Sequence, residues 1–157
     1  MNVNVYIEVE PGIRRFPRAA GFILELPIEN KPPVTLTNVD FTTTETESGA
    51  QLEILLKALG RLKKKCNLTI YTQNQYLQGI ERIEEWRKNN WQDSHKNTRP
   101  YARLWEKLEI ALKPHSYRFV IGEHHSYKSW LEAEVKKEGR KQRHEKERES
   151  ETVHTEG

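Results

Sequence analysis

The sequence predicts an α/β domain: a five-stranded mixed sheet flanked by helices, followed by a charged C-terminal tail. The evidence is a change of pattern along the chain. Residues 3–41 alternate apolar and polar side chains across short connections, which is typical of an antiparallel meander. From residue 48 onward, helical patterns alternate with two further strand patterns. The later strands are therefore expected to join the same sheet through helices on its faces.

Five segments carry the alternation of a strand. The first ends at Pro11-Gly12, and a turn at residues 30–33 separates the second from the third. The expected strands cover residues 3–10, 20–28, 34–41, 67–72 and 116–121.

Four helices are expected between and after these strands. In the first, leucines from Leu52 to Leu59 recur at the spacing of one helix face, and Ser48 is the expected cap. The expected helices cover residues 48–60, 74–88 and 101–112, and a last helix begins near Tyr127.

The end of the chain differs from the rest in composition. Residues 136–157 are dense in charges of both signs and hold almost no apolar side chain. We expect this tail to bury nothing, and to be disordered or to prolong the last helix into solvent. Residues 1–135 are then expected to form one domain.

Bulk properties exclude several classes of protein. A net charge of +3 over 157 residues is too mild to indicate a nucleic-acid partner by itself. The single cysteine, Cys66, cannot form an internal disulfide, and no Cys/His spacing indicates zinc. The start of the chain lacks a signal-peptide pattern, and no apolar run is long enough to span a membrane. A cytoplasmic protein, monomeric by default, is expected.

Local motifs narrow the fold further. The chain contains, in order, VYIEVEPG (residues 5–12), SGAQL (48–52), IYTQNQY (70–76), WRKNNW (86–91) and GEHH (122–125). In this register it resembles bacterial-type ribonuclease H over almost everything before the tail. The resemblance implies an RNase H-like fold that binds RNA–DNA hybrids and cuts the RNA strand. It also implies two divalent cations, Mg²⁺ or Mn²⁺, held by four carboxylates.

Carried over position by position, the resemblance implies a degenerate site. Two of the four carboxylate positions fall on amides, and the fourth falls on Glu132, or on Glu134 if the last loop is shortened differently. The implied site consists of Glu10, Gln51, Gln73, Glu132 and the loop residue His124, which matches a histidine that assists product release.

The residues at these positions predict that the chain has lost two-metal hydrolysis. Two cations about 3.5–4 Å apart need anionic oxygens, because carboxylates screen the repulsion between the metals. Gln51 and Gln73 offer only neutral oxygens, so Glu10 and Glu132 are at most the remaining metal ligands. Both amides are alternatively plain polar residues at the ends of elements. Their coincidence with two carboxylate positions favours a site that lost its charges.

Other acidic residues could supply the carboxylates that the site lacks. Glu8 shares a strand face with Glu10 by the period of two. Further acids lie near the first helix or in the last loop: Asp40, Glu45, Glu47, Glu53 and Glu123. One interpretation leaves these residues as solvated surface acids, and the other is a rearranged site with one metal.

The segment from Trp86 to Trp91 interleaves aromatic and basic residues, and Lys96 and Arg99 follow it. Cations neutralise phosphates and aromatic faces pack against sugars or bases, which indicates nucleic-acid contact. The alternative is that Trp86 and Trp105 are core residues beside a solvated basic face, an interpretation we favour for Trp105. The predicted nucleic-acid-binding residues are Gln75, Trp86, Arg87, Lys88 and Trp91.

Three functions remain open from the sequence. The favoured one is an RNase H-fold protein that binds an RNA–DNA hybrid or a duplex and has lost two-metal hydrolysis. The alternatives are an active RNA–DNA hybrid ribonuclease with atypical metal ligands, and a protein-interaction scaffold that uses the charged tail for docking.

Overall fold

A computed structural model describes residues 1–12 and 18–156 of the chain. The elements are β1 (Asn2–Val9), β2 (Ala19–Ile28), β3 (Lys31–Phe41), α1 (Glu47–Leu59), β4 (Asn67–Thr72), the 3₁₀ helix η1 (Tyr76–Arg82), α2 (Ile83–Lys88), α3 (Ala102–Leu112), β5 (Ser116–Ile121) and α4 (Lys128–Glu156).

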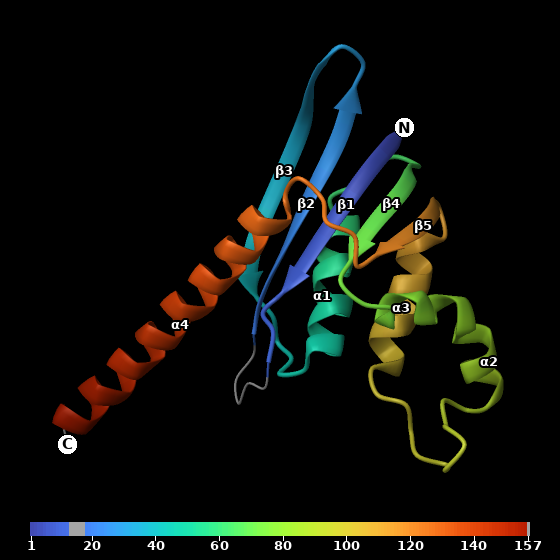
Figure 1. Cartoon of the computed structure of the whole chain (residues 1–157). Helices are drawn as coiled ribbons and strands as arrows, with labels where there is room; N and C mark the ends of the chain where they lie inside the picture. Colours follow the sequence, from blue (N-terminus) through green and yellow to red (C-terminus); the bar gives the residue numbers. More distant parts are fainter. Residues whose placement is uncertain (13–17, 157) are drawn as a thin grey trace.

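The five strands form one sheet in the order β3-β2-β1-β4-β5 (Figure 1). β2 pairs antiparallel with both β1 and β3, whereas β4 pairs parallel with both β1 and β5. The predicted mixed sheet is confirmed. Because β1 and β4 are parallel neighbours, their carboxyl ends open at the same edge of the sheet, which is where α/β sheets place ligand sites.

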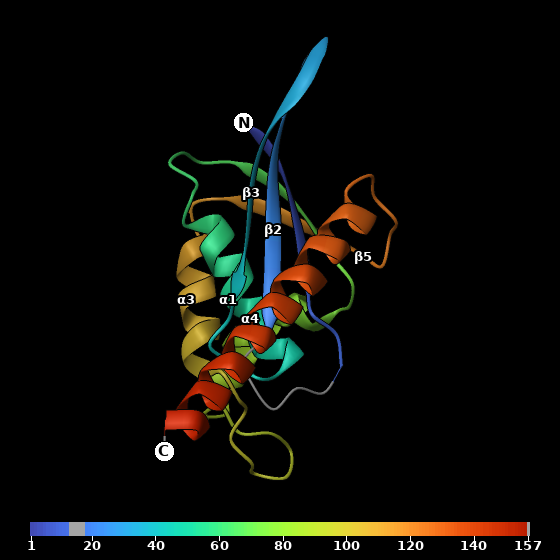
Figure 2. The ribbon, with the colours of Figure 1, turned by 90° about the vertical axis from the view of Figure 1, so that its left-hand side faces the viewer.

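The sheet is covered on both faces, but unequally. α1 and α3 lie on one face, and α4 crosses the other face obliquely (Figures 1 and 2). The larger core joins β1, β2 and β4 to α1, η1 and α3, and includes Trp105 at 2% exposure, which confirms its predicted core position. A smaller core lies under α4 and contains Tyr6, Ala19, Ile23, Leu131 and Val135. No described helix is both long enough and apolar enough to cross a membrane.

The segment expected as one helix over residues 74–88 is instead a 3₁₀ helix followed by a short α-helix. Its buried side chains are Leu77, Ile80, Ile83 and Trp86, each three residues after the last. A 3₁₀ helix has three residues per turn, so this spacing places its buried residues on one side. The first helix also differs in its cap: Thr46, not Ser48, accepts a hydrogen bond from the Gly49 amide.

The charged tail continues α4 beyond residue 135 without a break, up to Glu156. The expectation that it buries nothing is wrong for its first turns. Gly139 is buried, and Arg143 forms an ion pair with the buried Glu10. The final tail residue, Gly157, lies outside the described residues. The charged part of α4 thus packs beside the sheet through a glycine and an ion pair, beyond the apolar contacts of Leu131 and Val135.

Candidate functional site

A cavity of about 120 Å³ opens at the carboxyl ends of β1 and β4, beside the start of α1. Among its lining residues are Glu8 from β1, Gln51 from α1 and Gln73, which follows β4. An adjoining hollow of about 260 Å³ shares Glu8 and Gln73 and extends to Glu132 on α4. Four elements therefore bring carboxylates and amides to one edge of the sheet, where Glu47 and Asn74 also line the cavity.

Three of the predicted site residues meet at this edge, with Glu8 in place of Glu10. The parallel pairing of β1 with β4 aligns Tyr6 with Tyr71. Continuing this alignment by two residues places Glu8 opposite Gln73, and side chains two apart point to the same face. Glu10 lies a further two residues along, past the end of β1.

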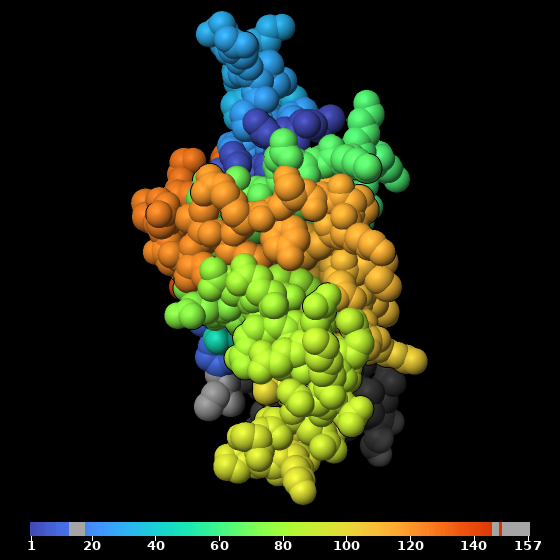
Figure 3. Space-filling view, turned by 90° about the vertical axis from the view of Figure 1, so that its right-hand side faces the viewer, coloured from blue at the N-terminus to red at the C-terminus, as the bar shows by residue number. Residues whose placement is uncertain are grey.

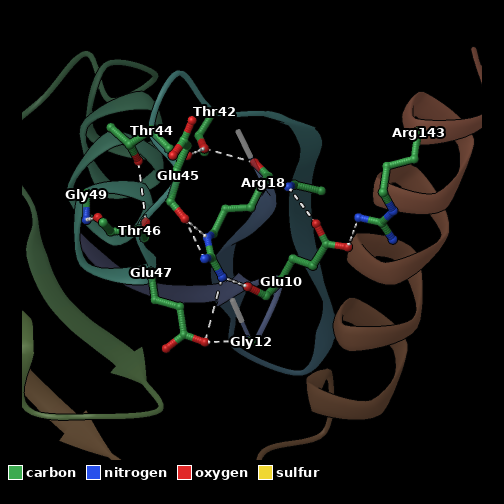
Figure 4. A network of polar contacts seen from close by, with 11 residues as sticks. Glu10, Gly12, Arg18, Thr42, Thr44, Glu45, Thr46, Glu47, Gly49 and Arg143 are labelled. Carbon is green, nitrogen blue, oxygen red and sulfur yellow. Dashed lines mark hydrogen bonds and ion pairs between the residues drawn. The ribbon is translucent and has the colours of Figure 1, made fainter. Parts of the chain in front are cut away.

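The carboxylate of Glu10 is fully enclosed and paired (Figure 4). Its Oε2 accepts a hydrogen bond of 2.6 Å from Nη1 of Arg143, and its Oε1 accepts one of 3.3 Å from the Ala19 amide. Its main-chain oxygen accepts from the buried Arg18. A Cβ atom on Gly139 would overlap the Glu10 carboxylate, so the glycine is what lets α4 lie this close. Glu10 holds α4 against the sheet.

Glu8 is also buried, at 8% exposure, but its Oε2 has no hydrogen-bond partner among the described residues. Gln51 is 7% exposed, and its Oε1 likewise lacks a partner in the described part of the chain. Burial raises the pKa of Glu8 to about 7, although the neighbouring Lys128 and Lys136 act to lower it. Near neutral pH, Glu8 is therefore ionised only part of the time.

A lysine lies among the remaining oxygens of the site. Nζ of Lys128 is 2.5 Å from Oε1 of Gln73 and 2.9 Å from Oε1 of Glu132. Within the described ranges, no cluster of three or more His, Cys, Asp or Glu side chains could hold a metal ion. The set of two carboxylates and two amides, with a lysine bonded to it, does not fit a pair of divalent cations.

The loop between β5 and α4 carries the predicted His124, which is exposed. Its neighbour His125 packs inward instead, and its ring lies 4.5 Å from the Tyr6 ring between centroids. Burial lowers the pKa of His125.

The alternative fourth carboxylate position, Glu134, does not line the hollow that Glu132 lines.

A second feature is a groove of about 420 Å³ between η1, α2 and α3. Gln75, Arg82, Trp86, Arg99 and Trp105 are among the residues that line it. The guanidinium carbons of Arg99 and Arg82 lie 5.0 Å and 5.9 Å from the centre of the Trp86 ring. Nε1 of Trp86 and Nε of Arg99 are buried donors without a partner among the described residues. The groove thus combines an aromatic wall with two guanidinium groups and one carboxylate, that of Glu81.

The predicted nucleic-acid-binding residues divide between this groove and other surfaces. Gln75 and Trp86 line the groove, and the Trp91 ring lies 6.2 Å from that of Trp86. Arg87 instead forms a 2.7 Å ion pair with Glu109 on α3, and Lys88 is exposed at the end of α2. The connection from α2 to α3 projects from the body of the molecule (yellow in Figure 3).

Sequence reasoning missed Arg82 as a groove residue. A signal for it was present, because Arg82 precedes Trp86 by four residues, the spacing at which helical side chains meet. Arg99 follows the aromatic segment in the sequence, but only the fold places its guanidinium over Trp86.

Comparison with known proteins assigns the chain to a family. The RNase H family model matches residues 14–149. The chain belongs to the ribonuclease H family. Among its relatives, ribonuclease H of Bradyrhizobium sp. (strain ORS 278) is 40% identical over 72 residues, covering 45% of this chain and 47% of the relative. Ribonuclease H of Rickettsia massiliae is 41% identical over 81 residues, covering 49% and 53%. The chain spans about half the length of these ribonuclease H relatives.

Solved structures share the fold at lower identity. LC9-RNase H1, a type 1 RNase H with the type 2 active-site motif, superposes with a TM-score of 0.68 at 16% identity, over 87% of this chain and 71% of that one. A foamy viral protease-reverse transcriptase in complex with RNA/DNA hybrid gives 0.63 at 11% identity, over 87% and 19%. These likenesses support the ribonuclease H fold.

Proposed function

We propose that this chain binds nucleic acid, an RNA–DNA hybrid or a duplex, and does not cut it by two-metal hydrolysis. The observation that carries the proposal is the Arg99 guanidinium, whose central carbon lies 5.0 Å from the centre of the Trp86 ring at the groove. A guanidinium makes charge-assisted hydrogen bonds to phosphate oxygens, and an aromatic ring beside it can pack against a base or sugar.

The rest of the groove suits the same partner. Arg82 adds a second cation beside Trp86, and the exposed Gln75 supplies an amide at the end nearer the cavity. Contacts to phosphate position a nucleic acid without reading its sequence. The structural likeness to a reverse transcriptase in complex with RNA/DNA hybrid supports a hybrid as the first partner to test.

The donor set at the cavity supports the loss of hydrolysis. Paired cations stabilise both the attacking and the leaving oxygen, and they depend on charged, bridging ligands. Gln51 and Gln73 cannot supply that charge, and the Gln73 oxygen already accepts a hydrogen bond from Lys128.

One observation favours a second candidate, an active ribonuclease with atypical ligands. Glu8 Oε2 and Gln51 Oε1 are both unpartnered acceptors that line one cavity. Such a pair could bind a single Mg²⁺ or Mn²⁺ that keeps most of its water ligands. This site would use Glu8 where the sequence indicated Glu10.

A cleavage assay separates the two candidates. Labelled RNA–DNA hybrid is incubated with the protein and Mg²⁺ or Mn²⁺, and we expect no products. Cutting by the unaltered chain that disappears in Glu8→Ala would establish the second candidate. Cutting that survives in Glu8→Ala would not come from the single-metal site of the second candidate, because Glu8 is the charged ligand of that site.

Hybrid binding measured against salt tests the groove. Each phosphate contact contributes about 0.9 to the slope of log K against log salt for a B-form duplex. Arg99→Ala is expected to weaken binding and to lower the slope by about this amount. Arg87→Ala is the matched control, because Arg87 is held by Glu109 outside the groove and should change the slope less. Absence of binding even at low salt would favour the protein-interaction scaffold.

A further inference from the structure

We infer that Lys128 is a built-in cation of the cavity edge: its ammonium replaces bound metal there and makes nucleic-acid binding independent of divalent cations. The inference rests on the proposed function, and its test is separable from it. It follows from the contacts of Lys128, its place on α4 and the balance of charge around it.

The contacts of Lys128 are specific. Its Nζ donates to the Gln73 side-chain oxygen at 2.5 Å and lies 2.9 Å from the Glu132 carboxylate. The lysine side chain is only 22% exposed. It therefore bridges α4 to the end of β4 at the hollow lined by both Gln73 and Glu132.

The place of Lys128 on its helix is intrinsically unfavourable. It is the first residue of α4, where the helix dipole is positive and a cation is destabilised. A lysine at this position needs compensation from elsewhere, which the Gln73 oxygen and the Glu132 carboxylate provide. Its contacts with the site therefore outweigh an opposing local preference.

The balance of charge completes the argument. The hollow beside α4 holds two carboxylates, Glu8 and Glu132, and two ammonium groups, because Lys136 lines it and Lys128 contacts Glu132. A further carboxylate in the adjoining cavity, Glu47, already accepts a hydrogen bond from the Gly12 amide and lies 3.7 Å from Arg18. The full formal charges cancel. A divalent cation is drawn to a site by an excess of anionic oxygens. Here it would meet none, and it would be repelled by an ammonium already in contact with two of the available oxygens.

The inference also explains the chemistry of Gln73. An amide oxygen accepts a hydrogen bond from Lys128 without adding charge, so the lysine and Glu132 remain a matched pair. An arrangement of amide, ammonium and carboxylate holds α4 to the sheet edge as a bridging metal could, but it has no capacity to activate water as a bound dication does.

The test compares four proteins: the unaltered chain, Lys128→Met, Lys128→Arg and Lys137→Met. Methionine keeps the stem of the lysine without its charge, arginine keeps the charge, and Lys137 is an exposed lysine on the same helix. Mn²⁺ is titrated into each free protein, and binding is followed by electron paramagnetic resonance and by the shift of the unfolding temperature.

We expect Lys128→Met to bind Mn²⁺ at least about tenfold more tightly than the unaltered chain, because a close unit charge that repels the dication is gone. Lys128→Arg and Lys137→Met should match the unaltered chain. Stoichiometric Mn²⁺ binding by the unaltered chain, unchanged in Lys128→Met, would overturn the inference. Equally weak binding by all four proteins would also overturn it, since the lysine would then not be what keeps the metal out.

Hybrid binding by the unaltered chain, measured in parallel with EDTA and with Mg²⁺, keeps the two proposals distinct. Equal affinity in both solutions supports the role of Lys128. Binding that requires Mg²⁺ overturns that role but leaves the proposed function standing. If no hybrid binds in either solution, the proposed function fails, while the Mn²⁺ titrations still decide whether Lys128 excludes metal.

Discussion

Two buried glutamates lie two residues apart at the end of β1, and their surroundings are opposite. Glu10 is 1% exposed, with its carboxylate paired to Arg143 and bonded to the Ala19 amide. Glu8 is 8% exposed and lines a cavity, where its Oε2 has no partner within the described residues. The same residue type, on the same strand face, is a structural ion pair in one place and a poorly solvated acid in the other.

The difference shows how this chain separates stability from ligand chemistry. A buried charge is tolerated when it is paired and hydrogen-bonded, and Glu10 meets that condition through α4. An unpaired buried acid shifts its pKa instead, as Glu8 does. We therefore expect substitutions at Glu10 and Arg143 to change the free energy of unfolding. Substitutions at Glu8 should change how that free energy depends on pH, and should change the cavity.

The largest effect is expected from Arg143→Met, which removes the ion pair that Arg143 forms with the buried Glu10 carboxylate. We expect a loss of about 3 kcal/mol in the free energy of unfolding, measured by urea denaturation. Arg140→Met, at an exposed position on the same helix, should change little. Adding Glu10→Gln to Arg143→Met should recover part of the loss. If Arg143→Met behaves like Arg140→Met, the ion pair does not hold α4.

A smaller effect, with a distinct pH signature, is expected from Glu8→Gln. The pKa of Glu8 is raised from 4.5 to about 7 on folding, so the folded state holds the proton more tightly than the unfolded chain. Stability therefore falls as the pH rises through this interval. Near pH 8, Glu8→Gln should be more stable than the unaltered protein by about 2 kcal/mol.

Near pH 4, where Glu8 is protonated in both states, the two proteins should have similar stability. The measurement is urea denaturation at several pH values, with Glu29→Gln as an exposed control that should not change the slope between pH 5 and 8. A difference between Glu8→Gln and the unaltered chain that stays constant with pH would show that Glu8 does not titrate in this range.

The smallest effect is expected from Gly139→Ala. A methyl group there would overlap the Glu10 carboxylate, which favours a loss, whereas alanine is the better helix former by about 1 kcal/mol. We expect a net loss of about 1 kcal/mol by thermal or urea denaturation. Lys137→Ala, at an exposed position, is the control. A stabilising Gly139→Ala would mean that α4 does not pack closely over Glu10.

Much of the fold followed from residue patterns. The alternation of apolar side chains located the strands within a few residues, because a half-buried strand has one dominant period. The 3₁₀ helix was not found, since the period of three from Leu77 to Trp86 is close enough to an α-helical spacing to be taken for one. Packing of Gly79 against Trp86 and Trp105 is a contact between elements, which no local pattern contains.

The candidate site was predicted in part. The sequence predicts Gln51, Gln73 and Glu132 as site residues, and they lie together with Glu8 at one edge of the sheet. The sequence determined that the positions of Gln51 and Gln73 would be uncharged, because amides cannot ionise in any fold. It could not distinguish Glu8 from Glu10, which share a strand face. Only the path of α4 does so, by closing Gly139 and Arg143 over one glutamate and leaving the other at the cavity.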